Sequence, residues 1–215
     1  MQAHQTMVAT DGYEVALFPL EYMRISQGEG GSTSHQGSYA IDFLGWGANG
    51  RVYKCPCYAP VTMKVVYASS GTYRIFESIN KVHLADGSLD YLTIWFSHCD
   101  DNSPYYLGRV INQGEQCNST GTNGNVTGDH SHIICKKGKY TGQVQVNGHW
   151  TLRGQSHCYN CLYVNDTTLV RPLNYNWRTY QGGVTPPTPP IPTPVYKTHF
   201  KWVLYADKIR KRNNV

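Results

Sequence analysis

The chain has few charged residues and no long hydrophobic run, and both shortages narrow what it can be. Charged residues make up only 15% of its 215 residues, against 17 Tyr and 21 Gly, which favours short strands and turns over long helices. No window approaches the roughly 20 apolar residues of a membrane span, and no N-terminal stretch has the pattern of a signal peptide. We therefore expect a soluble, mainly β protein without its own secretion signal.

Nucleotide-binding motifs are also missing. The glycines between Gly108 and Gly128 are too irregularly spaced for a dinucleotide or phosphate-binding loop, and no suitable strand and helix flank them. The formal net charge of +5 indicates attraction to polyanions, which include nucleic acid, anionic lipid and anionic cell-wall polymers. Charge alone does not choose among these.

Proline divides the chain into three parts. Residues 1–180 form the expected domain, with the first 15 irregular and packing beginning at Phe18. Residues 181–194 contain six prolines and predict an extended linker. Residues 195–215 form a basic tail with four aromatic residues, suited to a membrane surface, an anionic wall polymer or a partner protein, or to a disordered solubilising end.

Seven cysteines cannot all pair with one another. Disulfides or unpaired buried thiols are the favoured interpretation. The alternative is a structural four-thiolate zinc site built from two close pairs, Cys55 with Cys57 and Cys158 with Cys161.

The segment Gly128–Ile134 contains the sequence His130-Ser131-His132, and its apolar end suggests a short strand entered from a loop. Residues two apart on a strand share a face and lie ~7 Å apart along the chain, so both imidazoles would face one space. Such a pair can build a metal site if partners come from elsewhere, although a lone His-x-His is more often a satisfied surface pair.

Three other residues are candidate partners. His35 follows a polar Gly-rich loop, and Asp42 lies on a predicted strand whose other face carries Tyr39, Ile41 and Phe43. A carboxylate with apolar neighbours needs a metal or a buried partner, unless the strand is simply at the surface. His98 ends the row Leu92, Ile94 and Phe96, as an ordinary rim histidine or a catalytic one.

Together, His35, Asp42, His98 and the terminal His-x-His resemble the signature of the lysostaphin-type (LytM-like) zinc metallopeptidases. The resemblance spans about residues 18–134 and includes Tyr58-Ala59-Pro60, Phe96-Ser97-His98 and Thr127-Gly128-Asp129. The gap of seven from His35 to Asp42 is similar to that in phage lysins and phage tail enzymes. The resemblance implies an antiparallel β-sheet with long loops that form a groove.

By this resemblance, zinc is the cofactor, His35, Asp42 and His132 are its ligands, and His98 and His130 are catalytic and unligated. Two histidines and a carboxylate leave a fourth position for water, as in catalytic zinc sites. The implied reaction is peptide-bond hydrolysis in bacterial peptidoglycan, by a phage endolysin or a virion-associated lysin that occupies the phage tail or, before lysis, the host cytoplasm.

The implied partners are peptidoglycan and, through the tail, phage tail proteins, with neither nucleic acid nor a membrane. One alternative is a catalytically silent wall-binding or phage tail structural module of the same fold. A second is a cysteine peptidase or amidase, with Cys99 or Cys57 as nucleophile and His98 or His130 as base.

Overall fold

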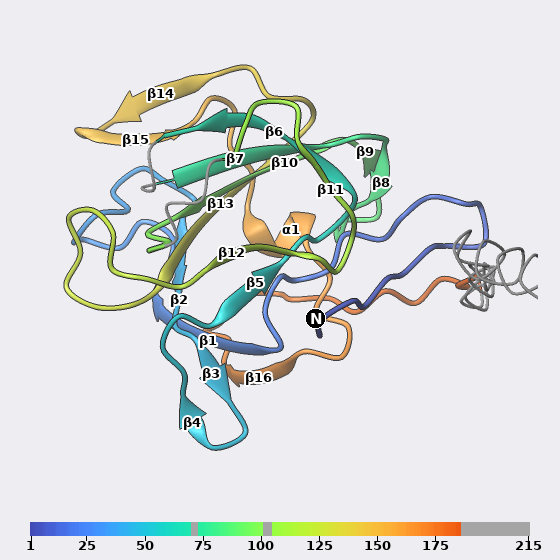
Figure 1. Cartoon of the computed structure of the whole chain (residues 1–215), viewed down its shortest axis with the longest axis horizontal. Helices are drawn as coiled ribbons and strands as arrows, with labels where there is room; N and C mark the ends of the chain where they lie inside the picture. The colour runs from blue at the N-terminus through green and yellow to red at the C-terminus, as the bar shows by residue number, and fades with distance from the viewer. Residues whose placement is uncertain (70–72, 101–104, 186–215) are drawn as a thin grey trace, which may run out of the picture. The chain divides into compact units, whose positions relative to one another are not determined.

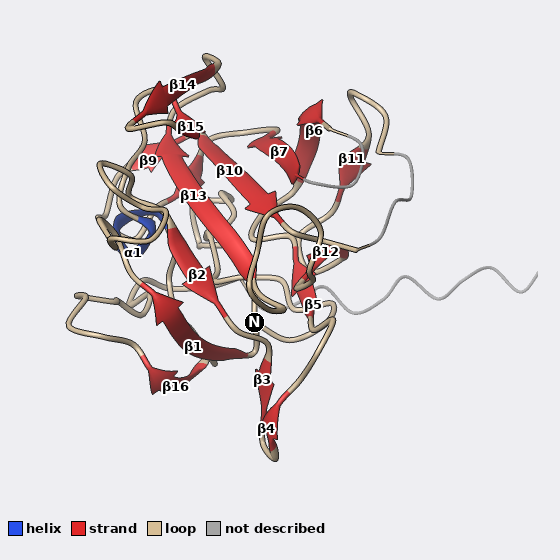
Figure 2. Ribbon diagram, turned by 90° about the vertical axis from the view of Figure 1, so that its left-hand side faces the viewer, coloured by secondary structure: helices blue, strands red, loops and turns tan. Residues whose placement is uncertain are grey.

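A computed structural model describes residues 1–69, 73–100 and 105–185 of the chain. Its centre is an eight-stranded sheet in the order β11-β6-β7-β10-β13-β2-β1-β16, with β1 and β16 parallel and the other neighbours antiparallel. Figure 2 shows these strands side by side, and Figure 1 shows the β14–β15 hairpin at the top of the view and the β3–β4 hairpin at the bottom. The prediction of a mainly β protein with an antiparallel sheet is confirmed.

The elements of the described residues are β1 (Tyr22–Gln27), β2 (Ile41–Phe43), β3 (Trp46–Gly47), β4 (Gly50–Arg51), β5 (Pro56–Tyr58), β6 (Met63–Ala68), β7 (Tyr73–Ser78), β8 (Val82–His83), β9 (Leu89–Asp90), β10 (Leu92–Ser97), β11 (Val110–Ile111), β12 (Gln116–Ser119), β13 (Ser131–Lys137), β14 (Gln143–Val146), β15 (His149–Leu152), α1 (Cys158–Cys161) and β16 (Thr168–Arg171).

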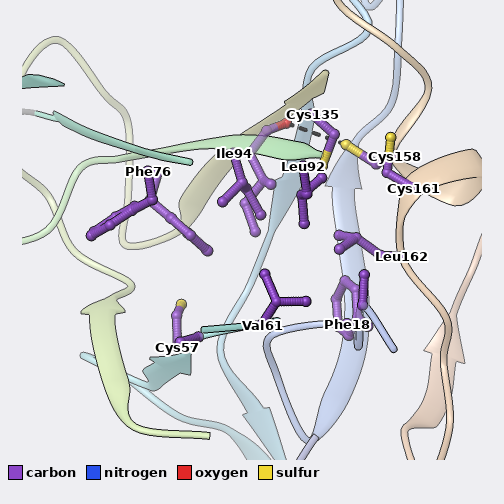
Figure 3. Packing of buried hydrophobic residues seen from close by; sticks show 14 of the residues in the cluster. Phe18, Cys57, Val61, Phe76, Leu92, Ile94, Cys135, Cys158, Cys161 and Leu162 are labelled. Carbon is purple, nitrogen blue, oxygen red and sulfur yellow. Dashed lines mark hydrogen bonds between the residues drawn. The ribbon is translucent and has the colours of Figure 1, made fainter. Parts of the chain in front are cut away.

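The two faces of the sheet are both covered, but unequally. Ile41, Phe43 and Ile133 point into the main core, which also contains Phe18 and Phe76. Figure 3 shows this core between the sheet and the segments that carry Cys57 and Leu162. The opposite face carries a smaller apolar cluster of Ala40, Ile75, Trp95, Ile134 and Leu152. Strand alternation therefore places residue 42 on the face of the smaller cluster, as the sequence predicts.

The core makes one direct prediction about stability. The Phe43 side chain is fully buried, and its ring centroid lies 5.0 Å from that of Phe18 and 6.3 Å from that of Trp177. Phe43→Ala should lower the free energy of unfolding by about 3–5 kcal/mol, because it removes apolar contact and leaves a cavity. Leu107→Ala, at a side chain 68% exposed, should change it by less than about 0.5 kcal/mol. Urea unfolding of both variants measures the difference, and equal effects would contradict this core.

Both ends of the domain differ from expectation. The prediction that packing begins at Phe18 is wrong, because Met1, Ala9 and Val15 are buried in a cluster with Leu17 and Tyr163. At the other end, residues 181–185 pair with the N-terminal segment, since Thr185 N donates to Val8 O at 2.8 Å. The rest of the proline-rich linker and the tail, residues 186–215, lie outside the described residues.

Asn147 and Gly148 connect β14 and β15, as their turn-forming sequence predicts. Both have positive φ, 49° and 82°, which the tight hairpin turn requires and which Asn and Gly tolerate. After this hairpin, Cys158–Cys161 forms α1, and the last strand is β16 (Thr168–Arg171). No helix within the described ranges is long and apolar enough to span a membrane.

The cysteines do not form the four-thiolate zinc site. All seven are free, and all except Cys55 are buried. Cys158 and Cys161 lie beside Cys135 at one end of the core, whereas Cys57 lies apart from them (Figure 3). Within the described part of the chain, the one group of three or more His, Cys, Asp or Glu side chains with ligand atoms within 4.8 Å of one another contains no cysteine. Unpaired buried thiols are therefore the interpretation that the structure supports.

Candidate metal centre

A groove of about 810 Å³ lies on the face of the sheet that carries the smaller apolar cluster. Its floor contains Asp42, His98, His130 and His132. One wall comes from the loop after β1 and another from the loop before β13. The lining residues that sequence reasoning did not single out include Tyr73, Trp95, His149 and Trp150.

Strand register brings two of the predicted ligands together. Asp42 on β2 is paired with His132 on β13, and His132 is paired in turn with Ser97 on β10. Directly paired residues of antiparallel strands have Cβ atoms about 4.5–5.5 Å apart and point to the same face. His132 Nδ1 consequently lies 2.9 Å from Asp42 Oδ1. Asp42 is only 8% exposed, so the alternative of a solvated surface carboxylate is wrong.

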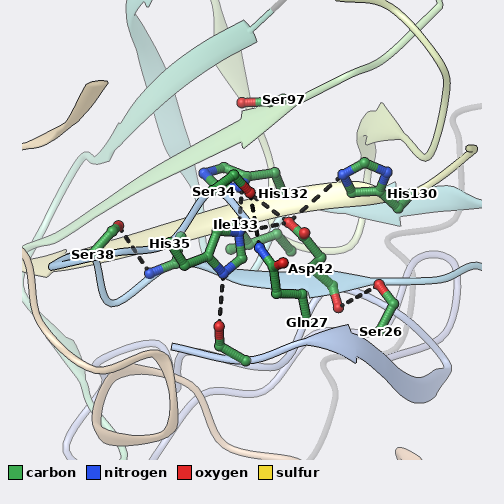
Figure 4. A network of polar contacts seen from close by, with 12 residues as sticks. Ser26, Gln27, Ser34, His35, Ser38, Asp42, Ser97, His130, His132 and Ile133 are labelled. Carbon is green, nitrogen blue, oxygen red and sulfur yellow. Dashed lines mark hydrogen bonds and ion pairs between the residues drawn. The ribbon is translucent and has the colours of Figure 1, made fainter. Parts of the chain in front are cut away.

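His35 joins this pair from the loop between β1 and β2. Its side chain is fully buried, with Nε2 3.2 Å from Asp42 Oδ1 and 3.1 Å from His132 Nδ1. Its Nδ1 lies 2.8 Å from Gly28 O, and because a carbonyl only accepts, the Nδ1–H donates. Figure 4 shows His35, Asp42 and His132 pointing toward one another, with His130 beside them.

The donor set fits a zinc ion. Ligand atoms at zinc distances of about 2.0–2.2 Å lie roughly 3.3 Å apart in a tetrahedron, close to the spacings of 2.9–3.2 Å in this site. With the proton of neutral His35 on Nδ1, its Nε2 presents a lone pair to a carboxylate oxygen. A cation among His35 Nε2, Asp42 Oδ1 and His132 Nδ1 would accept a lone pair from each of them. Neutral imidazoles alone leave the lone pair of His35 Nε2 facing the negative charge of the carboxylate.

The electrostatics of the ligands favour the same conclusion. Burial on its own would raise the pKa of Asp42, but hydrogen bonds and charge from His132 and His35 outweigh it and hold that pKa well below its usual value. Burial lowers the pKa of His132, partly offset by Asp42. At neutral pH the carboxylate is therefore ionised and the imidazole neutral, which are the forms that bind metal.

His98 and His130 stand beside the three predicted ligands. Their ring centroids are 4.5 Å apart, and the His98 ring lies 5.8 Å from that of His132. Each donates its Nδ1–H to a backbone carbonyl, His98 to Asn123 O at 2.9 Å and His130 to Gly128 O at 2.8 Å. Both rings are thereby fixed with Nε2 free, and His130 Nε2 lies 3.7 Å from Asp42 Oδ1.

His98 reaches the groove by a route that strand alternation does not predict. Leu92, Ile94 and Phe96 point into the main core, but His98 lines the groove on the opposite side with Ser97. The prediction that His98 continues the apolar row is therefore wrong. Strand β10 ends at Ser97, and the φ of 74° at His98 breaks the alternation.

Gly121 makes this turn possible. Its backbone pairs with His130 in both directions, at 3.1 Å and 3.0 Å, and a Cβ at Gly121 would lie 2.2 Å from His98 O. A side chain at this position would therefore separate the two segments that carry His98 and His130.

Neither cysteine proposed as a nucleophile is suited to the role. Cys57 is fully buried in the core, and burial raises the pKa of its thiol well above the usual value. Cys99 is 3% exposed, and its sulfur contacts Ser119 Oγ and Arg74 rather than an imidazole. Neither residue lines the groove. The cysteine-peptidase alternative is therefore wrong.

Comparisons with known proteins give partial likenesses. The chain is 34% identical over 170 residues to morphogenesis protein 1 of Bacillus phage B103. The aligned region covers 78% of this chain and 45% of that protein. It therefore spans less than half the length of this relative. No family model matches the chain.

Among solved structures, the chain is similar to a zinc-containing peptidase from Vibrio cholerae, with a TM-score of 0.39, 17% identity, and coverage of 61% of this chain and 43% of the other. It is also similar to the catalytic domain of the antimicrobial peptidase lysostaphin from Staphylococcus simulans, with a TM-score of 0.39, 17% identity, and coverage of 55% and 84%.

Proposed function

We propose that the chain is a zinc-dependent endopeptidase that hydrolyses peptide bonds in bacterial peptidoglycan, as a phage endolysin or a virion-associated lysin. The observation that carries the proposal is the convergence of the buried His35 Nε2 with Asp42 Oδ1 and His132 Nδ1, both of which belong to residues that line the groove, next to two further imidazoles. A silent binding module would need the fold and the groove, but not two imidazoles fixed beside the proposed ligand set.

His35, Asp42 and His132 would hold the zinc. When bound, zinc in such a site acts as a Lewis acid toward the scissile carbonyl and lowers the pKa of water. His98 is neutral at pH 7, because burial lowers its pKa to about 4, and its free Nε2 can accept a proton from the attacking water. His130 is the second imidazole at the reacting centre, and with a proton on Nε2 as well as on Nδ1 it would donate a hydrogen bond to the oxyanion that forms.

The groove suits an extended peptide. Its walls carry small neutral polar side chains, among them Ser26, Thr33 and Ser34, beside the exposed ring of Trp150. The one lysine or arginine among the described lining residues, Arg51, is already paired with the backbone oxygen and the carboxylate of Asp129. The positive net charge of the chain would act at longer range, by attracting it to an anionic wall.

The phage setting is supported by the relative in a Bacillus phage. In this setting the basic tail, residues 195–215, would attach the enzyme to the wall or to tail proteins of the particle, and the proline-rich linker would act as an extended spacer.

Chelation tests the proposed chemistry. The purified chain should release soluble peptides from peptidoglycan, lose this activity when a chelator removes zinc, and regain it when zinc is returned. A thiol-alkylating reagent should leave the rate unchanged, because the groove contains no cysteine among its lining residues. Wall binding without released peptides would instead identify a silent binding module. Mass spectrometry of the products identifies the bond that is cut.

A further inference from the structure

One peptide unit beside the metal centre is held on both of its edges. The carbonyl of Gly28 accepts the Nδ1–H of His35 at 2.8 Å, and the amide of Glu29 donates to Tyr175 Oη at 2.7 Å. These two groups belong to the same planar unit, so a rotation of that unit moves both. The hydroxyl of Tyr175 and the ring of His35 are therefore linked through a single rigid group.

The side chain of Glu29 anchors the same peptide to the C-terminal segment. Its Oε2 lies 2.7 Å from His157 Nδ1. The His157 ring is stacked between Tyr39 and Tyr159, at centroid distances of 4.0 Å and 4.9 Å, and Tyr159 is stacked on Tyr175 at 5.3 Å. A continuous row of four rings thus holds the Tyr175 hydroxyl against the loop that carries His35.

Gly28 fits under this hydroxyl because it has no side chain. A Cβ at Gly28 would lie 2.4 Å from Tyr175 Oη, 3.2 Å from Leu173 Cδ1 and 3.4 Å from Tyr175 Cζ. Gly28 is not among the glycines with positive φ, so space and not backbone conformation excludes a side chain here. Removing the hydroxyl oxygen would leave no contact below 3.2 Å.

We propose that Tyr175 is a positioning residue for His35, which fixes the ring so that Nδ1 carries the proton and Nε2 faces Asp42 and His132. Tyr175 touches neither the ligand atoms nor the groove, and it acts through the Gly28–Glu29 peptide. This inference rests on the proposed zinc site. Partners that orient a metal-binding histidine commonly change metal affinity by about 10–100-fold when they are removed.

The first test replaces one oxygen atom. Tyr175→Phe keeps the ring stack and removes the acceptor of the Glu29 amide, so zinc affinity should fall about tenfold, measured by competition with a chromophoric chelator. Tyr159→Phe is the matched control, because it also removes one hydroxyl, from the ring stacked on Tyr175. The Tyr159 hydroxyl makes no hydrogen bond to the described residues, whereas that of Tyr175 accepts from Glu29 N. The zinc affinity of Tyr159→Phe should equal that of the parent. Equal affinity in all three proteins would overturn the proposal.

A second test separates positioning from general stability. Gly28→Ala should weaken zinc binding about tenfold or more in the parent, because the methyl group displaces the peptide from Tyr175. In the presence of Tyr175→Phe the same change should have little further effect, since the closest contact is gone. The two effects are then strongly non-additive, as expected for groups that act as one unit. Additive effects would contradict the proposed link.

Nitrogen NMR of the histidine rings gives a readout that requires no metal. In the metal-free parent, His35 should be the Nδ1–H tautomer, and Tyr175→Phe should produce a mixture of tautomers while Tyr159→Phe does not. If the parent binds no zinc and cleaves no peptide, the proposed function fails, whatever the tautomer result. If the parent binds zinc and cleaves, but Tyr175→Phe changes neither zinc affinity nor the tautomer, only the positioning role fails.

Discussion

Replacing His132 with alanine is expected to release the zinc and reduce peptide hydrolysis to the background rate. His132 Nδ1 is one corner of a triangle whose other corners, Asp42 Oδ1 and His35 Nε2, lie 2.9 Å and 3.1 Å away. Without it, two protein ligands are left, whereas catalytic zinc sites have three. Metal analysis after gel filtration should find about one zinc per chain in the parent and none in the variant.

The matched control is His83→Ala. His83 lies on β8, and its Nε2 pairs with Asp11 Oδ2 at 2.9 Å, away from the residues that line the groove. This variant should keep its zinc and its turnover, so that the loss in His132→Ala cannot be ascribed to the removal of any imidazole. Circular dichroism should show that both variants are folded. A His132→Ala protein that retained zinc and hydrolysis would remove His132 from the ligand set.

Part of this site follows from local sequence alone. Strand alternation places Asp42 opposite the apolar side chains of Ile41 and Phe43, and the structure places those two in the main core. The same rule gives His130 and His132 a common direction. That Asp42 and His132 are directly paired depends on which strands become neighbours, and this is a property of the whole sheet. The resemblance to a family supplied this connection, and alternation did not.

Other features had no signal in the sequence. The positive φ of His98 depends on the close approach of Gly121, 23 residues along the chain, and a lone glycine in a loop does not reveal what it approaches. The hydrogen bond from Glu29 N to Tyr175 Oη joins residues 146 apart. The main-chain carbonyls that fix the rings of His35, His98 and His130 are carried by every residue type, so no pattern of side chains identifies them.

His98 and His130 are expected to matter for turnover and not for metal binding. Their rings lie close to the ligand set, but their ring nitrogens do not belong to the group of atoms within 4.8 Å of one another. The contact distances distinguish the two residues of the His-x-His sequence, because His132 Nδ1 is 2.9 Å from Asp42 Oδ1 and His130 Nε2 is 3.7 Å from it.

His98→Ala and His130→Ala should therefore each keep about one zinc per chain and lower turnover by about 10²–10⁴-fold, the usual range for a lost general acid–base group. The changes should appear in kcat, because a proton acceptor and an oxyanion donor act on the transition state more than on bound substrate.

Metal analysis measures the zinc content of each variant, and steady-state kinetics on a soluble peptide measures its turnover. His83→Ala is again the matched control, since it removes an imidazole that does not line the groove. If His130→Ala released the metal, His130 would be the ligand and His132 the catalytic residue. If His98→Ala were fully active, His98 would be an ordinary rim histidine, and His130 alone would serve the reaction.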